Sequence, residues 1–256
     1  MVKVLKRAVA VLEAVGRESG PTFTDIQGTT GLKKATLSRI LSSLEELGFV
    51  ERAPDRTYSV GSRLVALARP ALRRQVLSRV AERHARRLAG KLGELVTVGT
   101  VRHGHRYNLA RATVERSIVV DARLHQRPSP YDTATGRMML AHLNDEDLEA
   151  VIRANGLPGD AWPEISTREE LNEVLERIRR SGQAAYTSLD GEVEALAVPV
   201  RGPSGGVQAA VGVSMPSHRL DEERRREVLE SLRSTARAME HELSFELGEP
   251  AEGGEK

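Results

Sequence analysis

Side chains that could act as nucleophiles, acids or metal ligands are present in this sequence, but their spacing does not fit catalysis. Ser214 lies in Gly212-Val213-Ser214-Met215-Pro216, which lacks the second glycine of a nucleophile elbow. No two of the 7 histidines are four residues apart, as a zinc-binding helix would require, and there is no cysteine. Glycine loops of the spacing that cradles phosphates are also missing. We therefore expect neither an enzyme nor a bound metal or cofactor.

A different chemistry is indicated by small, polar and basic residues along one side of a predicted helix, about residues 34–47. Leu37, Leu41 and Leu44 fall at helical spacing on its apolar side. A helix that enters the major groove of DNA needs short side chains for close approach and a long donor, here Arg39, to reach a base or a phosphate. The predicted DNA contacts of this helix and its start are Lys33, Lys34, Ala35, Thr36, Ser38, Arg39 and Ser42.

Two further helices are predicted upstream. Thr24 and Gln27 have capping-box spacing, so we expect a helix to begin there, and Gly31 suits its end because glycine accepts the left-handed conformation. Apolar residues at helical spacing predict a first helix over residues 3–17. Together with the basic helix, these segments form a helix-turn-helix.

A two-stranded wing is predicted downstream. Two β-prone runs, residues 48–52 and 57–60, flank a turn that contains proline. Arg52 and Arg56 would then contact the sugar-phosphate backbone or the adjoining minor groove. The alternative for residues 1–60 is a small helical subdomain with a solvated basic face.

Charge is distributed unevenly along the chain. Residues 1–91 hold 18 Lys and Arg against 8 Asp and Glu, a net +10, whereas residues 92–256 hold 20 against 28, a net −8. A basic unit gains free energy on a polyanion by releasing counterions from phosphates. This asymmetry favours DNA as a partner, although solvated helix faces would give the same count.

Length and composition set the broad class. The 256 residues favour about two domains, and aromatic residues make up only 3%, so the cores must be built from Leu, Val and Ala. The amphipathic N-terminus lacks the features of a signal peptide, and no apolar run reaches the roughly 18 residues of a membrane span. We expect a cytoplasmic protein that has no membrane partner.

The rest of the chain predicts a linker helix and a second domain. Residues 61–72 form the linker, which should break or kink at Pro70, and six arginines follow it on a helix that could bind phosphate or pair with an acidic surface. Residues 73–247 mix strands and helices without strict alternation, which favours an α+β domain with a largely antiparallel sheet. The tail, residues 248–256, is expected to be disordered.

The boundaries of the second domain's elements follow from changes in periodicity. Expected helices cover about residues 71–92, 133–143, 145–155, 167–181 and 221–247. Expected strands cover residues 95–104, 105–114, 117–123, 183–189, 193–200 and 207–215.

Three runs resemble the IclR family of bacterial transcription regulators. GLKKATLSRILSSLEELGFVER resembles its recognition-helix region, YDTATGRMMLAHL its threonine- and glycine-containing helix start, and ALAVPVRGPSGGVQAAVGVSMPSHRL its paired C-terminal strands. The resemblance implies a winged helix-turn-helix joined to a GAF-like domain that binds a small metabolite effector. It also implies homodimers or tetramers on a partly palindromic double-stranded operator. Repression and activation both remain open.

The resemblance also locates an effector pocket. A helix start supplies unpaired N–H groups, and Thr133, Thr135 and Gly136 would place hydroxyls and close-approach backbone there, although either threonine could simply cap the helix. By resemblance, Ala195 and the strand from Gly212 to Ser214 form the opposite wall. The full predicted set is Thr133, Ala134, Thr135, Gly136, Met139, Asp190, Ala195, Gly212 and Ser214.

Polarity in this pocket should differ from that of some relatives. Several relatives carry a cysteine where this chain has Ala195-Leu196-Ala197, which favours a larger or more apolar effector. Arg111, His125 and Arg137 are candidates for binding a carboxylate. The alternative is a second domain that only dimerises or binds a protein partner, without a ligand.

Overall fold

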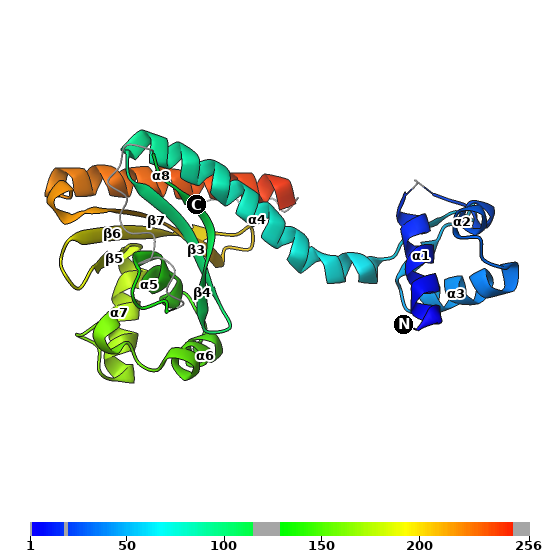
Figure 1. Cartoon of the computed structure of the whole chain (residues 1–256), viewed down its shortest axis with the longest axis horizontal. Coiled ribbons are helices and arrows are strands. Elements are labelled where there is room, and N and C mark those ends of the chain that lie inside the picture. Colours follow the sequence, from blue (N-terminus) through cyan, green and yellow to red (C-terminus); the bar gives the residue numbers. More distant parts are fainter. Residues whose placement is uncertain (1, 18–19, 115–128, 248–256) are drawn as a thin grey trace, which may run out of the picture. The chain divides into compact units, whose positions relative to one another are not determined.

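The chain divides into two compact units, Met1–Arg74 and Gln75–Lys256. The computed structural model describes residues 2–17, 20–114 and 129–247 (Figure 1). The predicted strand 117–123, His125 and the tail 248–256 lie outside these ranges. Within them, no helix is long and apolar enough to cross a membrane.

The first unit is a three-helix cluster with a small hairpin. Its core joins α1, α2 and α3 to the hairpin through buried residues such as Val11, Ile26, Leu37, Val50 and Tyr58. The strands pair antiparallel, with Val50 opposite Val60. The bounds are α1 Lys3–Arg17, α2 Phe23–Thr30, α3 Lys34–Glu46, β1 Val50–Arg52 and β2 Tyr58–Val60. The predicted helix-turn-helix and wing are confirmed.

The cap of α2 lies two residues before the predicted one. Thr22, not Thr24, is the N-cap, and its hydroxyl accepts a hydrogen bond from the Asp25 amide at 3.4 Å. The Asp25 carboxylate accepts one from the Thr22 amide at 2.8 Å. The Thr22 hydroxyl, which donates to the Asp25 carboxylate at 2.6 Å, and the Thr22 amide together lower the pKa of Asp25. The capping box at Thr24 and Gln27 was therefore wrong, because Thr22 and Asp25 have the same spacing one half-turn earlier.

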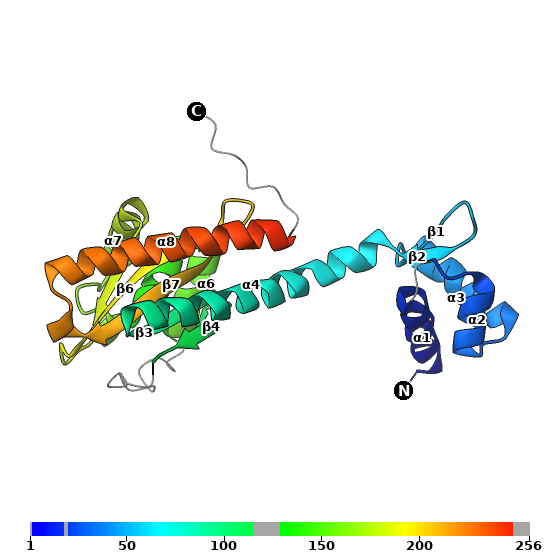
Figure 2. The ribbon, with the colours of Figure 1, turned by 90° about the horizontal axis from the view of Figure 1, so that it is seen from above.

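The second unit is built on an antiparallel sheet. Its described strands lie in the order β4-β3-β7-β6-β5. Helices α4 and α8 cover one face, and α5, α6 and α7 lie on the other (Figures 1 and 2). The strands are β3 Leu95–Arg102, β4 His105–Ala112, β5 Ala184–Thr187, β6 Val193–Arg201 and β7 Val207–Pro216. The helices are α4 Ser62–Leu92, α5 Ala134–Leu140, α6 Asp145–Asn155, α7 Arg168–Ser181 and α8 Glu222–Leu247, with short 3-10 turns η2 Gly159–Ala161 and η3 Ser217–Arg219.

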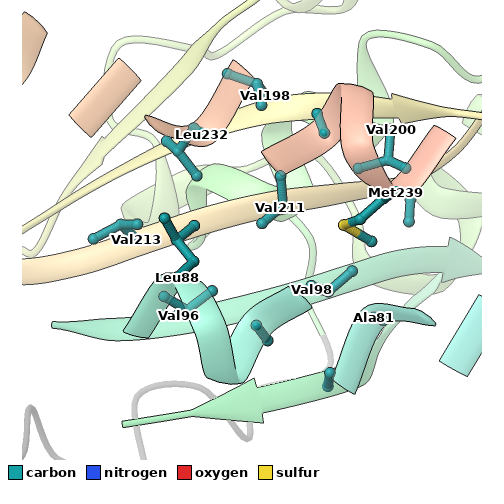
Figure 3. Close-up of a cluster of buried hydrophobic side chains, with 14 of the residues drawn as sticks. Ala81, Leu88, Val96, Val98, Val198, Val200, Val211, Val213, Leu232 and Met239 are labelled. Atoms are coloured by element: carbon teal, nitrogen blue, oxygen red, sulfur yellow. The ribbon is translucent and has the colours of Figure 1, made fainter. Parts of the chain in front are cut away.

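The two faces of this sheet differ in side-chain size. Branched residues such as Val96, Val198 and Val211 point toward α4 and α8, where they meet Leu88 and Met239 (Figure 3). Small residues occupy much of the face toward α5, among them Gly99, Ala195, Ala197, Ala210 and Gly212. Small side chains let a helix lie close to a sheet, so the short helix α5 packs directly on these strands.

Helix α4 contains most of the predicted linker, residues 61–72, and continues beyond it. It runs from Ser62 to Leu92 with Pro70 inside, so the separate helices expected on either side of a break at Pro70 form one element. A proline in a helix interior removes one hydrogen bond and costs about 3 kcal/mol. The continuous helix is held beyond Pro70 by buried residues from Leu77 to Leu92, which pack in the core of the second unit.

The sequence left open whether the arginines of α4 bind phosphate or pair with an acidic surface, and the structure answers this for two of them. Arg83 forms an ion pair with Glu242 of α8 at 2.7 Å, and Arg79 pairs with Glu246. His84, which is buried, meets the Glu242 carboxylate through Nε2 at 2.9 Å. These residues therefore tie α4 to the acidic side of α8 and do not form a free phosphate-binding surface.

Candidate DNA-binding and effector sites

One side of α3 is exposed and the other is buried. Leu37, Leu41 and Leu44 are 0%, 2% and 7% exposed and hold the helix on the core. On the opposite side, Thr36 is half-buried, and the other predicted contact residues, Lys33, Lys34, Ala35, Ser38, Arg39 and Ser42, are exposed. The structure therefore presents these residues together on one accessible face.

The start of α3 is suited to an anion. Lys33 is the N-cap residue and makes no side-chain capping bond, and the first turn contains no acidic residue. The first amides of a helix have no partner within the helix, and the helix dipole places positive charge at this end. Lys33 and Lys34 add two cations, so this end of α3 could bind a phosphate.

The wing places two arginines differently. The guanidinium of the exposed Arg52 lies 5.6 Å from the centroid of the Tyr58 ring, so a cation–π contact favours this position. Arg56 is exposed at the turn, where its amide donates to the Ala53 carbonyl at 2.9 Å. The Asp55 carboxylate accepts from the Thr57 hydroxyl and amide at 2.7 and 3.1 Å, and these bonds lower its pKa.

Arg56 has a left-handed backbone, with φ of 69°. This conformation costs a residue with a side chain about 1 kcal/mol, whereas glycine adopts it freely. We predict that Arg56→Gly is more stable to urea than Arg56→Ala by about 0.5 to 1 kcal/mol in the transition of the first unit. Both variants lack the charge, so they should lose equal affinity for DNA. Equal stability of the two variants would show that the wing relaxes without strain.

A small pocket lies between α5 and the sheet of the second unit. It contains about 260 Å³ of empty space, part of it open to solvent, and has room for about one water molecule. Its described lining comprises Thr97, Thr133, Ala134, Thr135, Tyr186, Ala195, Leu196, Gly212, Val213 and Ser214. Six predicted effector residues, Thr133, Ala134, Thr135, Ala195, Gly212 and Ser214, therefore meet at one site.

Strand register explains why these residues meet. Ser214 of β7 lies opposite Ala195 of β6, and Ala195 lies opposite Tyr186 of β5. Thr97 of β3 lies opposite Gly212 of β7. Residues paired across neighbouring strands share a face, so the two rows form the floor beneath α5, and Tyr186 on the edge strand β5 closes the pocket on its outer side.

Helix α5 forms the roof through two threonines with different roles. Thr133 is its N-cap, and the Thr133 hydroxyl accepts a hydrogen bond from the Gly136 amide at 3.1 Å. Thr135 lies over Gly212, where an added Cβ would be 2.8 Å from the Thr135 Cγ2. The capping role is therefore realised by Thr133, while Thr135 fills the space that Gly212 leaves. Since α5 has only seven residues, its dipole adds little charge at the pocket.

Three predicted effector residues do not line the pocket. Met139 is 4% exposed and belongs to the hydrophobic core around α5, one helical turn beyond the pocket-lining Thr135. A Cβ on Gly136 would collide with the Pro130 carbonyl, so this glycine serves a close backbone contact. Asp190 is exposed in the β5–β6 turn, where its carboxylate accepts from Ser188 and the Glu192 amide.

The pocket also contains residues that sequence reasoning missed. Tyr186, Leu196, Val213 and Thr97 line it, and the Thr97 hydroxyl is buried without a hydrogen-bond partner among the described residues. A buried unpaired hydroxyl costs about 1 to 3 kcal/mol, so it is a natural partner for a ligand. The signal available in the sequence was the polar Thr97 within β3, a mainly apolar strand that also holds Thr100.

Arg137 is the only one of the three carboxylate candidates that is packed inside the described structure, since Arg111 is exposed on β4. Its guanidinium lies 3.9 Å from the Trp162 ring centroid and 5.2 Å from that of Tyr186. Burial lowers the pKa of Arg137 to about 10, although the charges of Tyr186 and acidic neighbours oppose the shift. The group remains charged at neutral pH.

Comparison with known proteins identifies the family. The family model "IclR helix-turn-helix domain" matches residues 4–54, and "Bacterial transcriptional regulator IclR C-terminal" matches residues 70–241. The chain belongs to the IclR family of bacterial transcription regulators. It is thus an IclR-type DNA-binding regulator and not an enzyme.

Individual IclR-family relatives are similar over nearly their whole length. The HTH-type transcriptional regulator KdgR of Escherichia coli (strain K12) is 24% identical, over 93% of this chain and 92% of KdgR. The IclR homolog of Microbacterium hydrocarbonoxydans, solved in complex with 4-hydroxybenzoate, is 27% identical with a TM-score of 0.57, over 95% and 100% of the two chains. The IclR of Thermotoga maritima is 25% identical with a TM-score of 0.57, over 95% and 98%.

Proposed function

We propose that this IclR-family regulator reads a double-stranded operator through the exposed side of α3. The observation that carries the proposal is that α3 combines three features: an exposed surface of small and polar residues, the long donor Arg39, and a helix start without a side-chain cap. Arg39 is the base or phosphate donor, Ala35, Ser38 and Ser42 permit close approach, and Lys33 and Lys34 bind phosphate. Arg52 and Arg56 of the wing contact the backbone or the minor groove.

A small-molecule effector in the second unit modulates this binding. Two features support the proposal: the convergence of six predicted residues on one pocket and the 4-hydroxybenzoate bound to the IclR homolog of Microbacterium hydrocarbonoxydans. The pocket has room for about one water, whereas ligand sites usually offer about 300 Å³ or more. An effector must therefore expand the site, which couples its binding to a change of conformation.

Division of labour follows the predicted domain boundaries. Residues 1–60 bind DNA in the cytoplasm, residues 61–72 link, and residues 73–247 bind the effector and mediate oligomerisation. The division of the structure into units near residue 74 supports this proposal.

Within a homodimer or tetramer formed through residues 73–247, an additional contact between the DNA-binding units is supported by an apolar patch at α1. Val2, directly before α1, and Leu5 and Val9 of α1 are spaced three and four residues apart and are 63%, 63% and 52% exposed. Apolar side chains grouped in this way mark an interaction site, and a second copy would bring two recognition helices onto a partly palindromic operator.

Charged residues in this patch should prevent association of the DNA-binding units. We predict that the double variant Leu5→Asp, Val9→Asp loses about tenfold or more in operator affinity, because two half-sites are no longer bound together. Anisotropy titration measures the loss. The control is Glu13→Ala, an exposed change on the same helix, which should bind like the wild type. Unchanged affinity of the double variant would exclude the patch as a contact between the DNA-binding units.

The effector proposal is tested on DNA binding itself. Operator affinity is measured by fluorescence anisotropy at fixed salt with and without a panel of small metabolites that includes 4-hydroxybenzoate. At least one compound should shift the affinity in a saturable manner, and Ser214→Val should weaken that response. If no compound shifts it, the second unit serves only for dimerisation or protein contacts.

A further inference from the structure

Tyr186 is the outer wall of the pocket. Of the described residues that line the site, it alone is half-buried, and the others are buried. Tyr186 also lies on β5, at an edge of the sheet order and four residues long. An edge strand has neighbours on one side only, so displacing this wall disturbs fewer contacts than displacing the floor.

Arg137 holds this wall in place. Its guanidinium lies over the Tyr186 ring at 5.2 Å and over the Trp162 ring at 3.9 Å, distances at which cation–π attraction operates. It also donates to three backbone carbonyls: Nε to Tyr131 at 2.8 Å, Nη1 to Ala185 at 3.2 Å and Nη2 to Ala161 at 3.0 Å. One side chain thus joins β5, the start of α5 and η2.

Alternative roles for Arg137 fit these contacts poorly. Nε, Nη1 and Nη2 each already donate to a backbone carbonyl, so three of its five N–H groups hold neighbouring elements in place. A planar guanidinium can satisfy several carbonyls and stack at the same time, which an ammonium cannot. Its geometry therefore fits a positioning residue better than a ligand-binding one.

We propose that Tyr186 sets the size limit of the effector pocket and that Arg137 is the positioning residue that keeps it closed. A ligand larger than the present space displaces the Tyr186 ring from Arg137. This inference rests on the proposed effector function of the pocket. It adds a consequence that can be observed: the stack includes Trp162, the one tryptophan of the sequence, so ligand binding changes its fluorescence.

Two probes of one chemical class and different size test the size limit. 4-Hydroxybenzoate and the larger 6-hydroxy-2-naphthoate are titrated into the full-length protein by calorimetry, and Trp162 emission is recorded in parallel. Tyr186→Ala should raise affinity for the naphthoate relative to the benzoate by about tenfold, the scale on which pockets discriminate by size. Tyr186→Phe keeps the ring and should retain the wild-type ratio.

Arg137 is tested with a matched pair. Arg137→Met removes the charge and the planar guanidinium and should relax the size limit as Tyr186→Ala does. It should also increase the quenching of Trp162 by acrylamide. Arg137→Lys keeps the charge and should restore part of the wild-type protection of Trp162 from acrylamide quenching. Because Arg137→Met could unfold the unit, the Tyr186 pair decides the first part of the proposal independently.

Distinct results overturn the two levels of the account. The size-limit inference is overturned if the ratio of the two affinities is the same in Tyr186→Ala as in the wild type. It is also overturned if neither probe binds to either protein. Trp162 quenching that is equal in wild type and Arg137→Met, in a folded protein, overturns the positioning role. A changed ratio without any ligand effect on operator binding leaves the inference standing and contradicts the proposed function instead.

Discussion

Replacing Leu37 with alanine should unfold the DNA-binding unit while the second unit stays folded. Leu37 is 0% exposed and lies at the centre of the core formed by α1, α2 and the wing. Truncating a buried leucine costs about 2 to 5 kcal/mol, and a small domain has only a few kcal/mol in reserve. Specific DNA binding should fall in proportion to the fraction of the DNA-binding unit that is unfolded, although Leu37 is buried and cannot contact DNA.

The two units can be followed separately in this experiment. Trp162 lies in the second unit, so its fluorescence reports that unit, whereas far-ultraviolet circular dichroism reports both. We expect an early dichroism transition in Leu37→Ala and an unchanged fluorescence transition. Ser43→Ala, an exposed change on the same helix, is the control and should change the free energy of unfolding by less than about 0.5 kcal/mol. A free energy of unfolding for Leu37→Ala that is lower than that of the wild type by about 1 kcal/mol or less would contradict the assignment of Leu37 to the core.

Removing the Arg39 side chain should weaken binding to the operator by about 1 to 3 kcal/mol, the scale of a bidentate base contact. Arg39 is exposed on α3 beside Ala35, Ser38 and Ser42, whose short side chains leave its guanidinium the longest donor on that face. Binding to random DNA should fall much less, because phosphate contacts supply most of that affinity. The measurement is anisotropy with both DNAs at one salt concentration.

Arg56→Ala is the matched comparison for Arg39→Ala. It removes the same charge from the wing and should weaken operator and random DNA alike, with a salt dependence reduced by about one counterion. If Arg39→Ala also lowers both affinities equally, Arg39 contacts phosphate only and base reading must lie elsewhere on α3.

Periodicity predicted most elements of this fold from sequence. The α3 stripe of Leu37, Leu41 and Leu44 and the alternation in residues 207–215 each fit one secondary structure, because burial on one face imposes the repeat. Residues 167–181 also began where predicted, at the capping box of Thr167 and Glu170, which the structure confirms. Such patterns can be recognised from neighbouring residues alone, without information on tertiary contacts.

Predictions that depended on tertiary contacts were less successful. Pro70 stays inside α4 because the later turns are anchored in a core that no local rule includes. Met139 and Asp190 are near the pocket residues in sequence, yet Met139 is buried in the core one turn further along α5 and Asp190 is exposed in a turn. Tyr186 enters the site only through pairing with Ala195, a register that the sequence does not encode locally. The residues missed are therefore those placed by strand pairing and not by a motif.

The most direct test of the central claim is a competition titration. Genomic fragments bound by the full-length protein are sequenced, and the most enriched fragment is titrated by anisotropy against excess random duplex at fixed salt. The account predicts a partly palindromic site that is bound at least about a thousandfold more tightly than random DNA. Enriched fragments without a common sequence, or affinity no greater than for random duplex, would contradict an operator-specific regulator.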